Sequence, residues 1–346
     1  NGLKIFSSKG YKLPDREEDE IADLINTGRI RDIRPTARDI GKARRIDDAI
    51  GRYIVFCKET LPKDLGLDGL RLVLDCANGA TYKVAPIIFS ELGAEVTAIH
   101  NEPNGFNIND GCGSQFTQNL QAEVRRQKAD VGLAFDGDGD RLIAVDEQGR
   151  TLTGDHLMAI CARYYRDRGL LDGNRVVATV MSNFGFLQAM QSLGIAVETA
   201  PVGDRYVIER MREVGAVVGG EASGHIIFHN HHTTGDGIIS ALQVLAAMRG
   251  SGRPLSELAQ VMTMAPQELM NVEVARKPAL EEVPALAKAI REAEAELGGD
   301  GRVLVRYSGT QPLCRVMVES RDEALTVDLC RRLAGVVRDE LGKEEG

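Results

Sequence analysis

An apolar run that ends in a glycine-spaced acidic loop constrains this chain more than any other feature. Residues 131–135 read VGLAF, the length of one buried strand, and lead directly into DGDGDR at residues 136–141. Glycine permits a tight turn without a Cβ clash, so Asp136, Asp138 and Asp140 can converge on one point. Three converging carboxylates repel one another unless a cation lies between them, and all-oxygen ligation suits Mg²⁺. We therefore expect a magnesium site at the end of a buried strand.

Arg141 closes the acidic loop and is a candidate partner for a phosphate held near the metal. Two other protein classes carry similar loops. A calcium EF-hand needs glycine at the sixth position, where this loop has Arg141, and its loop follows a helix rather than a strand. A haloacid-dehalogenase-type phosphohydrolase also runs from a hydrophobic strand into Asp-x-Asp, with Asp136 as nucleophile and Asp138 as general acid. That enzyme class stays open.

Length and charge restrict the classes of protein that fit. At 346 residues the chain has room for two to four domains. A net charge of −9 disfavours a nucleic-acid or anionic-membrane binder, and no apolar run reaches membrane-spanning length. Six cysteines without short paired spacing indicate free thiols in a reducing cytoplasm rather than a disulfide frame or a zinc site. We expect a cytoplasmic protein with no nucleic-acid or membrane partner.

A unit of helix, glycine turn and short strand recurs along the chain, at residues 89–99, 190–199 and 211–218. Gly93, Gly194 and Gly215 occupy the position where a helix ends in the left-handed conformation. Strands that alternate with helices indicate α/β layers, which bind ligands at the carboxyl ends of their strands. Further helices are expected over residues 14–25, 46–60, 237–249 and 279–297, and further strands over 2–6, 70–76 and 303–305.

Two more loops carry groups suited to a phosphorylated ligand. Residues 306–312 read RYSGTQP, and Arg315 follows shortly after. This segment combines hydroxyl groups, a glycine and two arginines, each of which can make two hydrogen bonds to a phosphate. Residues 219–225 read GGEASGH, where Glu221 and Ser223 can bond sugar hydroxyls and His225 can donate to a phosphate or shuttle a proton.

Weaker candidates lie nearby. Gly203 and Asp204 belong to a segment that is expected to line the substrate site. His229, His231 and His232 lack acidic or cysteine partners at a familiar metal-ligand spacing, so we interpret them as part of a polar loop.

In combination these loops resemble the α-D-phosphohexomutase superfamily, and within it the glucosamine branch. The likeness covers essentially the whole chain and rests on four loops in the family's order. They are DGDGDR at 136–141 for metal, GEASGH at 220–225 for sugar, RYSGT at 306–310 for phosphate, and DCANGAT at 75–81. VMSN at 180–183 and TTGDG at 233–237 add to the likeness. Gln311 departs from the family, which usually has an acid there, and Ala222 stands at a variable position.

The resemblance implies an intramolecular phosphotransferase that interconverts glucosamine 6-phosphate and glucosamine 1-phosphate on the route to UDP-N-acetylglucosamine. A phosphoserine would donate its phosphoryl group to the phosphorylated hexosamine, with hexosamine 1,6-bisphosphate as intermediate and activator. The implied metal ligands are Asp136, Asp138 and Asp140, and the implied catalytic residues are Lys4, Arg141 and His225. The implied substrate ligands are Gly203, Asp204, Glu221, Ser223, Arg306, Ser308, Gly309, Thr310 and Arg315.

The resemblance also implies four parts. Residues 1–40 would be the end of a first α/β domain, residues 41–146 and 147–265 two further α/β domains, and residues 266–346 a smaller α+β domain that closes as a lid. In this family Asn-Gly-x-Lys follows shortly after the loop that carries the phosphorylated serine, and here these residues stand at positions 1–4. We therefore expect that serine to be missing and the chain alone to be inactive. A mannose or glucose phosphate mutase, a phosphohydrolase and a non-catalytic phosphosugar-binding protein remain alternatives, and a homodimer is left open.

Overall fold

The computed structural model describes residues 5–309 and 311–342, so Lys4 and Thr310 lie outside the described residues. The chain divides into two compact units. The first comprises residues 1–181 and 195–260, and the second comprises residues 182–194 and 261–346. Each unit is built around its own sheets, which are mixed α/β layers in the first and an antiparallel α+β layer in the second.

The first sheet of unit 1 carries the acidic loop. Its strand order is β2-β1-β3-β4-β5, in which β1, β2 and β3 run parallel while β4 and β5 return antiparallel. All five residues of β3 and of β4 are buried, as expected for the apolar run before the acidic loop. Helix α4 packs on β1 and β3, and α3 on β2. The bounds are β1 Arg71–Asp75, β2 Glu95–Ile99, β3 Val131–Phe135, β4 Leu142–Asp146, β5 Thr151–Leu152, α3 Val84–Glu91 and α4 Gln118–Gln127.

The second sheet of unit 1 has the order β7-β6-β8-β9, with β9 antiparallel to β8 and the other pairs parallel. Helix α7 packs on β6 and β8, while α5 and α8 pack against each other. Twelve consecutive residues of α8 are buried, so this helix forms the centre of the unit. The bounds are β6 Arg175–Thr179, β7 Ala196–Ala200, β8 Val218–Gly220, β9 Ile226–Phe228, α5 Gly154–Asp167, α7 Asp204–Val214, α8 Gly237–Ser251 and α9 Leu255–Leu258.

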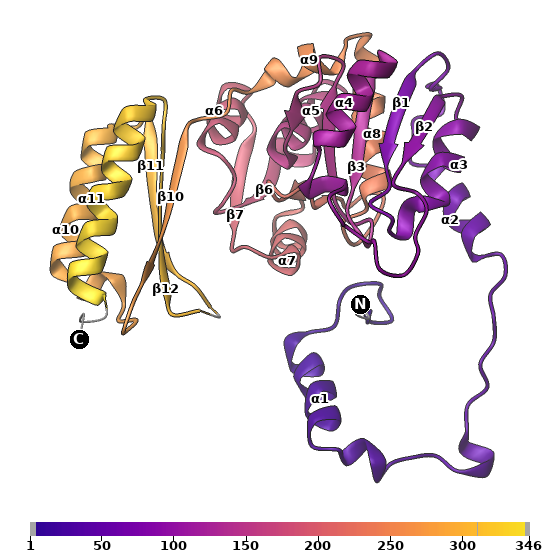
Figure 1. Ribbon diagram of the computed structural model, residues 1–346, viewed down its shortest axis with the longest axis horizontal. Helices are drawn as coiled ribbons and strands as arrows, with labels where there is room; N and C mark the ends of the chain where they lie inside the picture. Colours follow the sequence, from indigo (N-terminus) through magenta and orange to yellow (C-terminus); the bar gives the residue numbers. More distant parts are fainter. Residues whose placement is uncertain (1–4, 310, 343–346) are drawn as a thin grey trace. The chain divides into compact units, whose positions relative to one another are not determined.

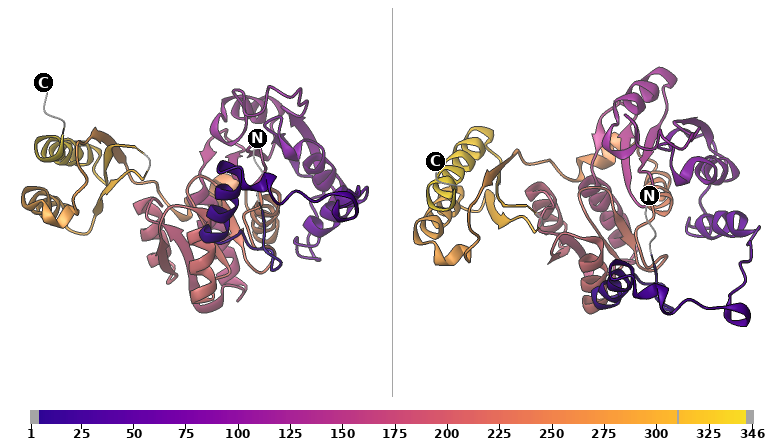
Figure 2. Two further views of the ribbon diagram at one scale, coloured as in Figure 1. Left: turned by 90° about the horizontal axis from the view of Figure 1, so that it is seen from below. Right: turned by 60° about the horizontal axis from the view of Figure 1, so that its bottom comes forward.

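Unit 2 is a three-stranded antiparallel sheet of order β10-β12-β11. Figures 1 and 2 show α10 and α11 lying side by side on one face of this sheet. Their apolar faces and the strands share a core that includes Val316, Val318, Leu286, Leu329 and Leu333. The bounds are β10 Gln267–Glu273, β11 Gly301–Tyr307, β12 Leu313–Ser320, α6 Phe184–Ser192, α10 Pro284–Leu297 and α11 Glu323–Leu341.

The chain before the first sheet contains α1 Asp15–Asn26 and α2 Ala49–Lys58, joined by 3-10 turns and extended segments. Phe6 pairs with Lys12 in an isolated bridge, so within the described residues the expected first strand is reduced to this pair. Among the described residues, no helix combines the length and apolar character needed to cross a bilayer. The 3-10 turns are η1 Arg29–Arg31, η2 Ala37–Asp39, η3 Ala80–Tyr82, η4 Gly113–Gln115, η5 Asp172–Asn174, η6 Ala259–Val261 and η7 Leu280–Glu282.

The glycine turns are confirmed, and one helix start is corrected. Gly93, Gly194 and Gly215 have φ values of 101°, 68° and 69°, in the region that favours glycine. The helix expected from residue 279 begins at Pro284 instead, after a 3-10 turn. Proline lacks an N–H and has a fixed φ, so it is suited to the first position of a helix and not to its interior.

Candidate active site

The acidic loop is the hairpin connection between β3 and β4. Phe135, the last residue of β3, stands opposite Leu142, the first of β4. Asp136 Oδ1 accepts hydrogen bonds from the N–H groups of Gly139 and Arg141, both at 3.1 Å, which orients its carboxylate across the loop. Gly139 has a φ of 78°, so the turn needs a residue without Cβ there. The structure therefore forms the predicted tight loop at the end of the predicted strand.

Carboxylate oxygens of Asp136, Asp138 and Asp140 lie within 4.8 Å of one another. Burial, followed by the charge of Asp140, raises the pKa of Asp136 to about 7. A carboxylate cluster whose own charges oppose ionisation needs a cation to balance it, and a set of oxygen ligands fits the hard ion Mg²⁺. These three residues therefore fit magnesium.

Arg141 lies against this cluster. Its Nε is 3.8 Å from Asp136 Oδ2 and 3.9 Å from Asp140 Oδ1, and its side chain is partly exposed. The guanidinium keeps donors for an anion because these contacts exceed hydrogen-bond length. An arginine in this position can bring a phosphate next to the three carboxylates.

The loop between β8 and β9 presents Glu221 and Ser223. Glu221 Oε1 accepts from the N–H of Gly203 at 2.9 Å, and Ser223 Oγ lies 3.4 Å from Glu221 Oε2. Gly203 has a φ of 132° and directly precedes α7. The structure thus brings together Gly203, Glu221 and Ser223, three of the residues predicted to bind substrate.

His225 ends this loop and is 3% exposed. Its Nε2 accepts from the N–H of Gly235 at 3.2 Å, so in the neutral ring the proton lies on Nδ1, which is 3.5 Å from Asp140 Oδ2. A Cβ at residue 235 would lie 2.5 Å from the imidazole, so this packing requires glycine. Such burial and pairing suit a residue that orients Asp140 better than one that shuttles protons through solvent.

Asp204 is the first residue of α7 and forms an ion pair with Lys12. His225 Nε2 lies 3.8 Å from the same Asp204 carboxylate. Burial favours a higher pKa for Asp204, but Lys12 and His225 outweigh it and hold the pKa below its usual value. Lys12 was not predicted as a site residue, because it lies in an irregular segment and meets Asp204 only through the tertiary fold.

Two backbone hydrogen bonds join the acidic loop to the neighbouring elements of unit 1. The N–H of Leu142 donates to the carbonyl of Gly224 at 3.0 Å, and the N–H of Gly237 donates to the carbonyl of Gly139 at 2.9 Å. A Cβ at Gly224 would lie 2.2 Å from Leu142 O, so the loop between β8 and β9 needs glycine to approach the acidic loop. The two predicted loops of unit 1 are therefore parts of one site.

The predicted phosphate loop joins β11 to β12 in unit 2. Arg306 and Arg315 are register partners on these strands, and burial followed by the charge of Arg315 lowers the pKa of Arg306. Arg315 Nε is buried and makes no hydrogen bond within the described residues. Two cross-strand arginines, one of them with a buried Nε, offer donors that suit an anion.

The backbone of this loop is held by a residue that the sequence did not single out. Lys277 Nζ donates to the carbonyls of Ser308 and Gln311, at 2.6 and 2.8 Å. Ser308 is 4% exposed, and its Oγ accepts from the N–H of Gln311 at 3.3 Å, while Gly309 is exposed. Thr310 lies outside the described residues. Lys277 is 29 residues from Arg306 along the chain, so no local pattern links it to the loop.

Three family models match consecutive parts of the chain. They are described as phosphoglucomutase/phosphomannomutase alpha/beta/alpha domain II, alpha/beta/alpha domain III and C-terminal domain, and they match residues 52–149, 153–265 and 269–336. The chain belongs to the phosphoglucomutase/phosphomannomutase family. It is a mutase of the phosphohexomutase fold, and the acidic, sugar and phosphate loops described above lie within the matched residues.

Individual relatives in this family are close in sequence. The chain is 55% identical over 342 residues to phosphoglucosamine mutase of Syntrophus aciditrophicus and 52% identical over 342 residues to phosphoglucosamine mutase of Syntrophobacter fumaroxidans. Each alignment covers 99% of this chain and 76% of the relative. The fold is also similar to that of Aspergillus fumigatus N-acetylphosphoglucosamine mutase in complex with GlcNAc-6P and magnesium. That match has 21% identity and a TM-score of 0.69, and covers 86% of this chain and 67% of that one.

Proposed function

We propose that this mutase interconverts glucosamine 6-phosphate and glucosamine 1-phosphate, on the route to UDP-N-acetylglucosamine and cell-wall precursors. The observation that carries the proposal is the 55% identity with a phosphoglucosamine mutase across 99% of the chain. The loops for metal, sugar and phosphate give the proposal a physical basis, because each offers groups that suit one part of a phosphorylated hexosamine.

The acidic loop is the place for the phosphoryl transfer. Asp136, Asp138 and Asp140 would hold Mg²⁺, which, when bound, polarises a phosphoryl group and neutralises its developing charge. Arg141 would orient the reacting phosphate, because its guanidinium lies beside two of these carboxylates. His225 would fix the orientation of Asp140 through Nδ1.

The remaining residues would position the sugar. Glu221 and Ser223 would bond vicinal hydroxyls, while Gly203 and Asp204 line the same region of unit 1. Arg306, Ser308, Gly309, Thr310 and Arg315 would hold the phosphate that is not reacting, since a doubly charged anion matches two opposed arginines. Lys4 would assist proton transfer.

The phosphoryl donor in this proposal is a phosphoserine, to which no residue of this sequence is assigned. Its phosphoryl group passes to one sugar hydroxyl and yields hexosamine 1,6-bisphosphate, which reorients and returns its other phosphate to the serine. The same bisphosphate would act as activator by phosphorylating the serine. We further propose the four-part division at residues 40, 146 and 265, a cytoplasmic location, and a homodimer as the state to test.

Comparative turnover tests the substrate. The native gene product is assayed with glucosamine 6-phosphate, glucose 6-phosphate and mannose 6-phosphate, each with Mg²⁺ and a trace of the matching bisphosphate. The proposal expects kcat/KM for the amino sugar to exceed the other two by at least about tenfold, or ~1.4 kcal/mol of discrimination. An equal or higher value for glucose or mannose phosphate would assign the chain to the other branch of its family.

A further inference from the structure

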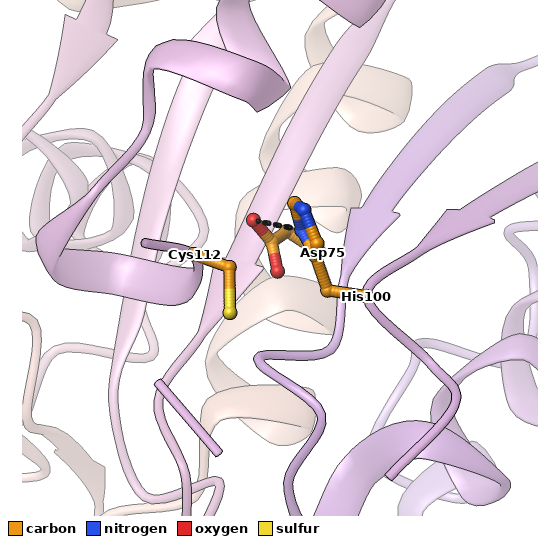
Figure 3. Close-up of side chains that lie close together, drawn as sticks. All are labelled: Asp75, His100 and Cys112. Carbon is orange, nitrogen blue, oxygen red and sulfur yellow. Dashed lines mark ion pairs between the residues drawn. The ribbon is translucent and has the colours of Figure 1, made fainter. Parts of the chain in front are cut away.

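A second cluster of metal-ligating side chains lies in unit 1, apart from the acidic loop in sequence. It consists of Asp75, His100 and Cys112, whose ligand atoms lie within 4.8 Å of one another (Figure 3). Asp75 ends β1, His100 directly follows β2, and Cys112 directly precedes η4. The topology therefore brings three kinds of donor to the carboxyl ends of two neighbouring parallel strands, where α/β folds place their sites.

The carboxylate of Asp75 is fully buried and firmly oriented. Its Oδ1 accepts from the N–H of Ala77 and its Oδ2 from the N–H of Gly113, both at 2.9 Å. A buried carboxylate fixed by backbone donors resembles a metal ligand with its outer hydrogen bonds in place. A carboxylate has about four lone-pair sites, so these two bonds leave acceptor capacity for a cation.

His100 pairs with Asp75 but does not have the geometry of a hydrogen bond to it (Figure 3). Its Nδ1 is 3.0 Å from Asp75 Oδ2, yet that nitrogen is buried and makes no hydrogen bond within the described residues. The residue also has a φ of 47°, a conformation that is strained for a side chain with Cβ. The ring nitrogen and the carboxylate oxygen are therefore close together without the angle of a hydrogen bond. Two atoms that bind the same metal ion have this arrangement.

Cys112 completes the set with a thiol that is 1% exposed. The structure gives its Sγ one weak donor, Asn78 Nδ2 at 4.0 Å. His100, by contrast, keeps 26% of its side chain exposed, so an ion and a water molecule can enter from its side. The cluster is thus enclosed on the sulfur side and open on the imidazole side.

Carboxylate oxygen, imidazole nitrogen and thiolate sulfur together select a borderline-soft cation. Zn²⁺ takes these donors and adopts tetrahedral sites in which three protein ligands leave the fourth position to water. Mg²⁺ strongly prefers oxygen, so it suits the acidic loop and not this cluster. We propose that Asp75, His100 and Cys112 form a zinc site, distinct from the magnesium site of the mutase.

The position of the cluster indicates what such an ion does. It joins His100 and Cys112, the two ends of the segment 101–111, to the end of β1. Gly113, next to Cys112, lies against the carbonyl of Phe135, where a Cβ would be 2.6 Å from the oxygen. Phe135 directly precedes Asp136, so zinc would stabilise the support of the magnesium loop rather than take part in phosphoryl transfer.

Cobalt provides a direct test on the native gene product after chelator treatment. Co²⁺ binds zinc sites, and a cysteine ligand gives a thiolate-to-cobalt charge-transfer absorption that oxygen and nitrogen ligands do not give. We expect this band to saturate at one equivalent, to vanish in Cys112→Ser and to need at least about tenfold more Co²⁺ in His100→Gln. Cys76→Ser, which removes a buried neighbouring thiol outside the cluster, and Asp138→Asn should both keep the band.

Two results would overturn the proposal: no charge-transfer band in the wild type, or a band that persists in Cys112→Ser. A second measurement guards against a variant that fails to fold. Zn²⁺ should raise the Tm of the wild type in a concentration-dependent way, and should do so less in His100→Gln. A wild-type Tm that Zn²⁺ leaves unchanged would mean that the cluster is only a buried Asp–His pair.

Discussion

Arg306 of β11 stands directly opposite Arg315 of β12 in the antiparallel register of unit 2. Like charges in such cross-strand positions destabilise a sheet, and the neighbouring Arg315 together with burial lowers the pKa of Arg306. We therefore expect the pair to lower stability in the free protein and a bound anion to offset the repulsion. This relationship supports the proposal that the loop between the two strands binds phosphate.

Replacing Arg306 with alanine should separate affinity from stability. We expect phosphosugar binding to weaken by about 10- to 100-fold, because a charge-assisted hydrogen bond contributes about 1.5–3 kcal/mol. The Tm without ligand should hold or rise, since one of two repelling charges is gone. Calorimetric titration and thermal unfolding measure both, with Arg332→Ala on the exposed surface of α11 as control. Unchanged affinity in Arg306→Ala would contradict the assignment of this loop.

Lys277 should stabilise the same loop by bonding to the loop's backbone carbonyls. Its ammonium donates to the carbonyls of Ser308 and Gln311, so Lys277→Met should free the loop and weaken phosphosugar binding by about tenfold, or ~1.4 kcal/mol. Lys277→Arg keeps the charge and should recover part of the affinity. Lys288→Met is the matched control, because Lys288 is exposed and pairs only with Glu292 among the described residues. A loss of the same size in both methionine variants would point to a general charge effect.

Asp138→Asn tests the magnesium assignment. Removing one of three converging carboxylates should lower Mg²⁺ affinity by at least about tenfold, because ligand charge and number tune the affinity of such sites. The fold should be unaffected, since Asp138 is exposed. A Mg²⁺ titration by calorimetry that matches the wild type would exclude the acidic loop as the metal site.

Acid should destabilise unit 1 through three partly buried histidines. Burial lowers the pKa of His156, His229 and His231, with Arg150 adding to the effect on His156 and Arg212 to that on His229. Below the unperturbed value of about 6.5, the unfolded chain then binds more protons than the folded one, and stability falls as pH falls. Asp136 has the opposite effect on stability, because its raised pKa lets the folded chain bind a proton more readily than the unfolded one.

A variant isolates the histidine contribution. His231 Nε2 lies 3.3 Å from Tyr165 OH, and His231→Gln keeps a polar partner there without a titrating group. The drop in Tm between about pH 7 and about pH 5 should be smaller in His231→Gln than in the wild type. Calorimetric melts across this range provide the comparison, and identical slopes would contradict the prediction.

Local patterns predicted the parts of this structure that depend on local physics. The apolar run at residues 131–135 has the length of a buried strand, and the glycines after it favour a turn, so the tight acidic loop was predictable. The helix ends were predictable in the same way from Gly93, Gly194 and Gly215. Pro284 indicates the start of α10. The alanine- and glutamate-rich residues on both sides of it led to the earlier start that we expected.

Contacts between distant segments were not predictable in the same way. Lys12 meets Asp204 across 192 residues, and Lys277 holds a loop about 30 residues away. Cys112 had no partner at a recognisable spacing, because Asp75 and His100 reach it only through the pairing of β1 with β2. Such sites depend on strand order, which no single segment of the sequence encodes.

We propose that this mutase transfers phosphate within glucosamine phosphate without releasing it. Phosphorus NMR of the native gene product with glucosamine 6-phosphate, Mg²⁺ and a trace of bisphosphate tests it most directly. We expect the 6-phosphate signal to decline while a 1-phosphate signal grows to a constant ratio, with no inorganic phosphate. Steady release of inorganic phosphate would identify a phosphohydrolase instead, and an unchanged spectrum would contradict mutase activity on this sugar.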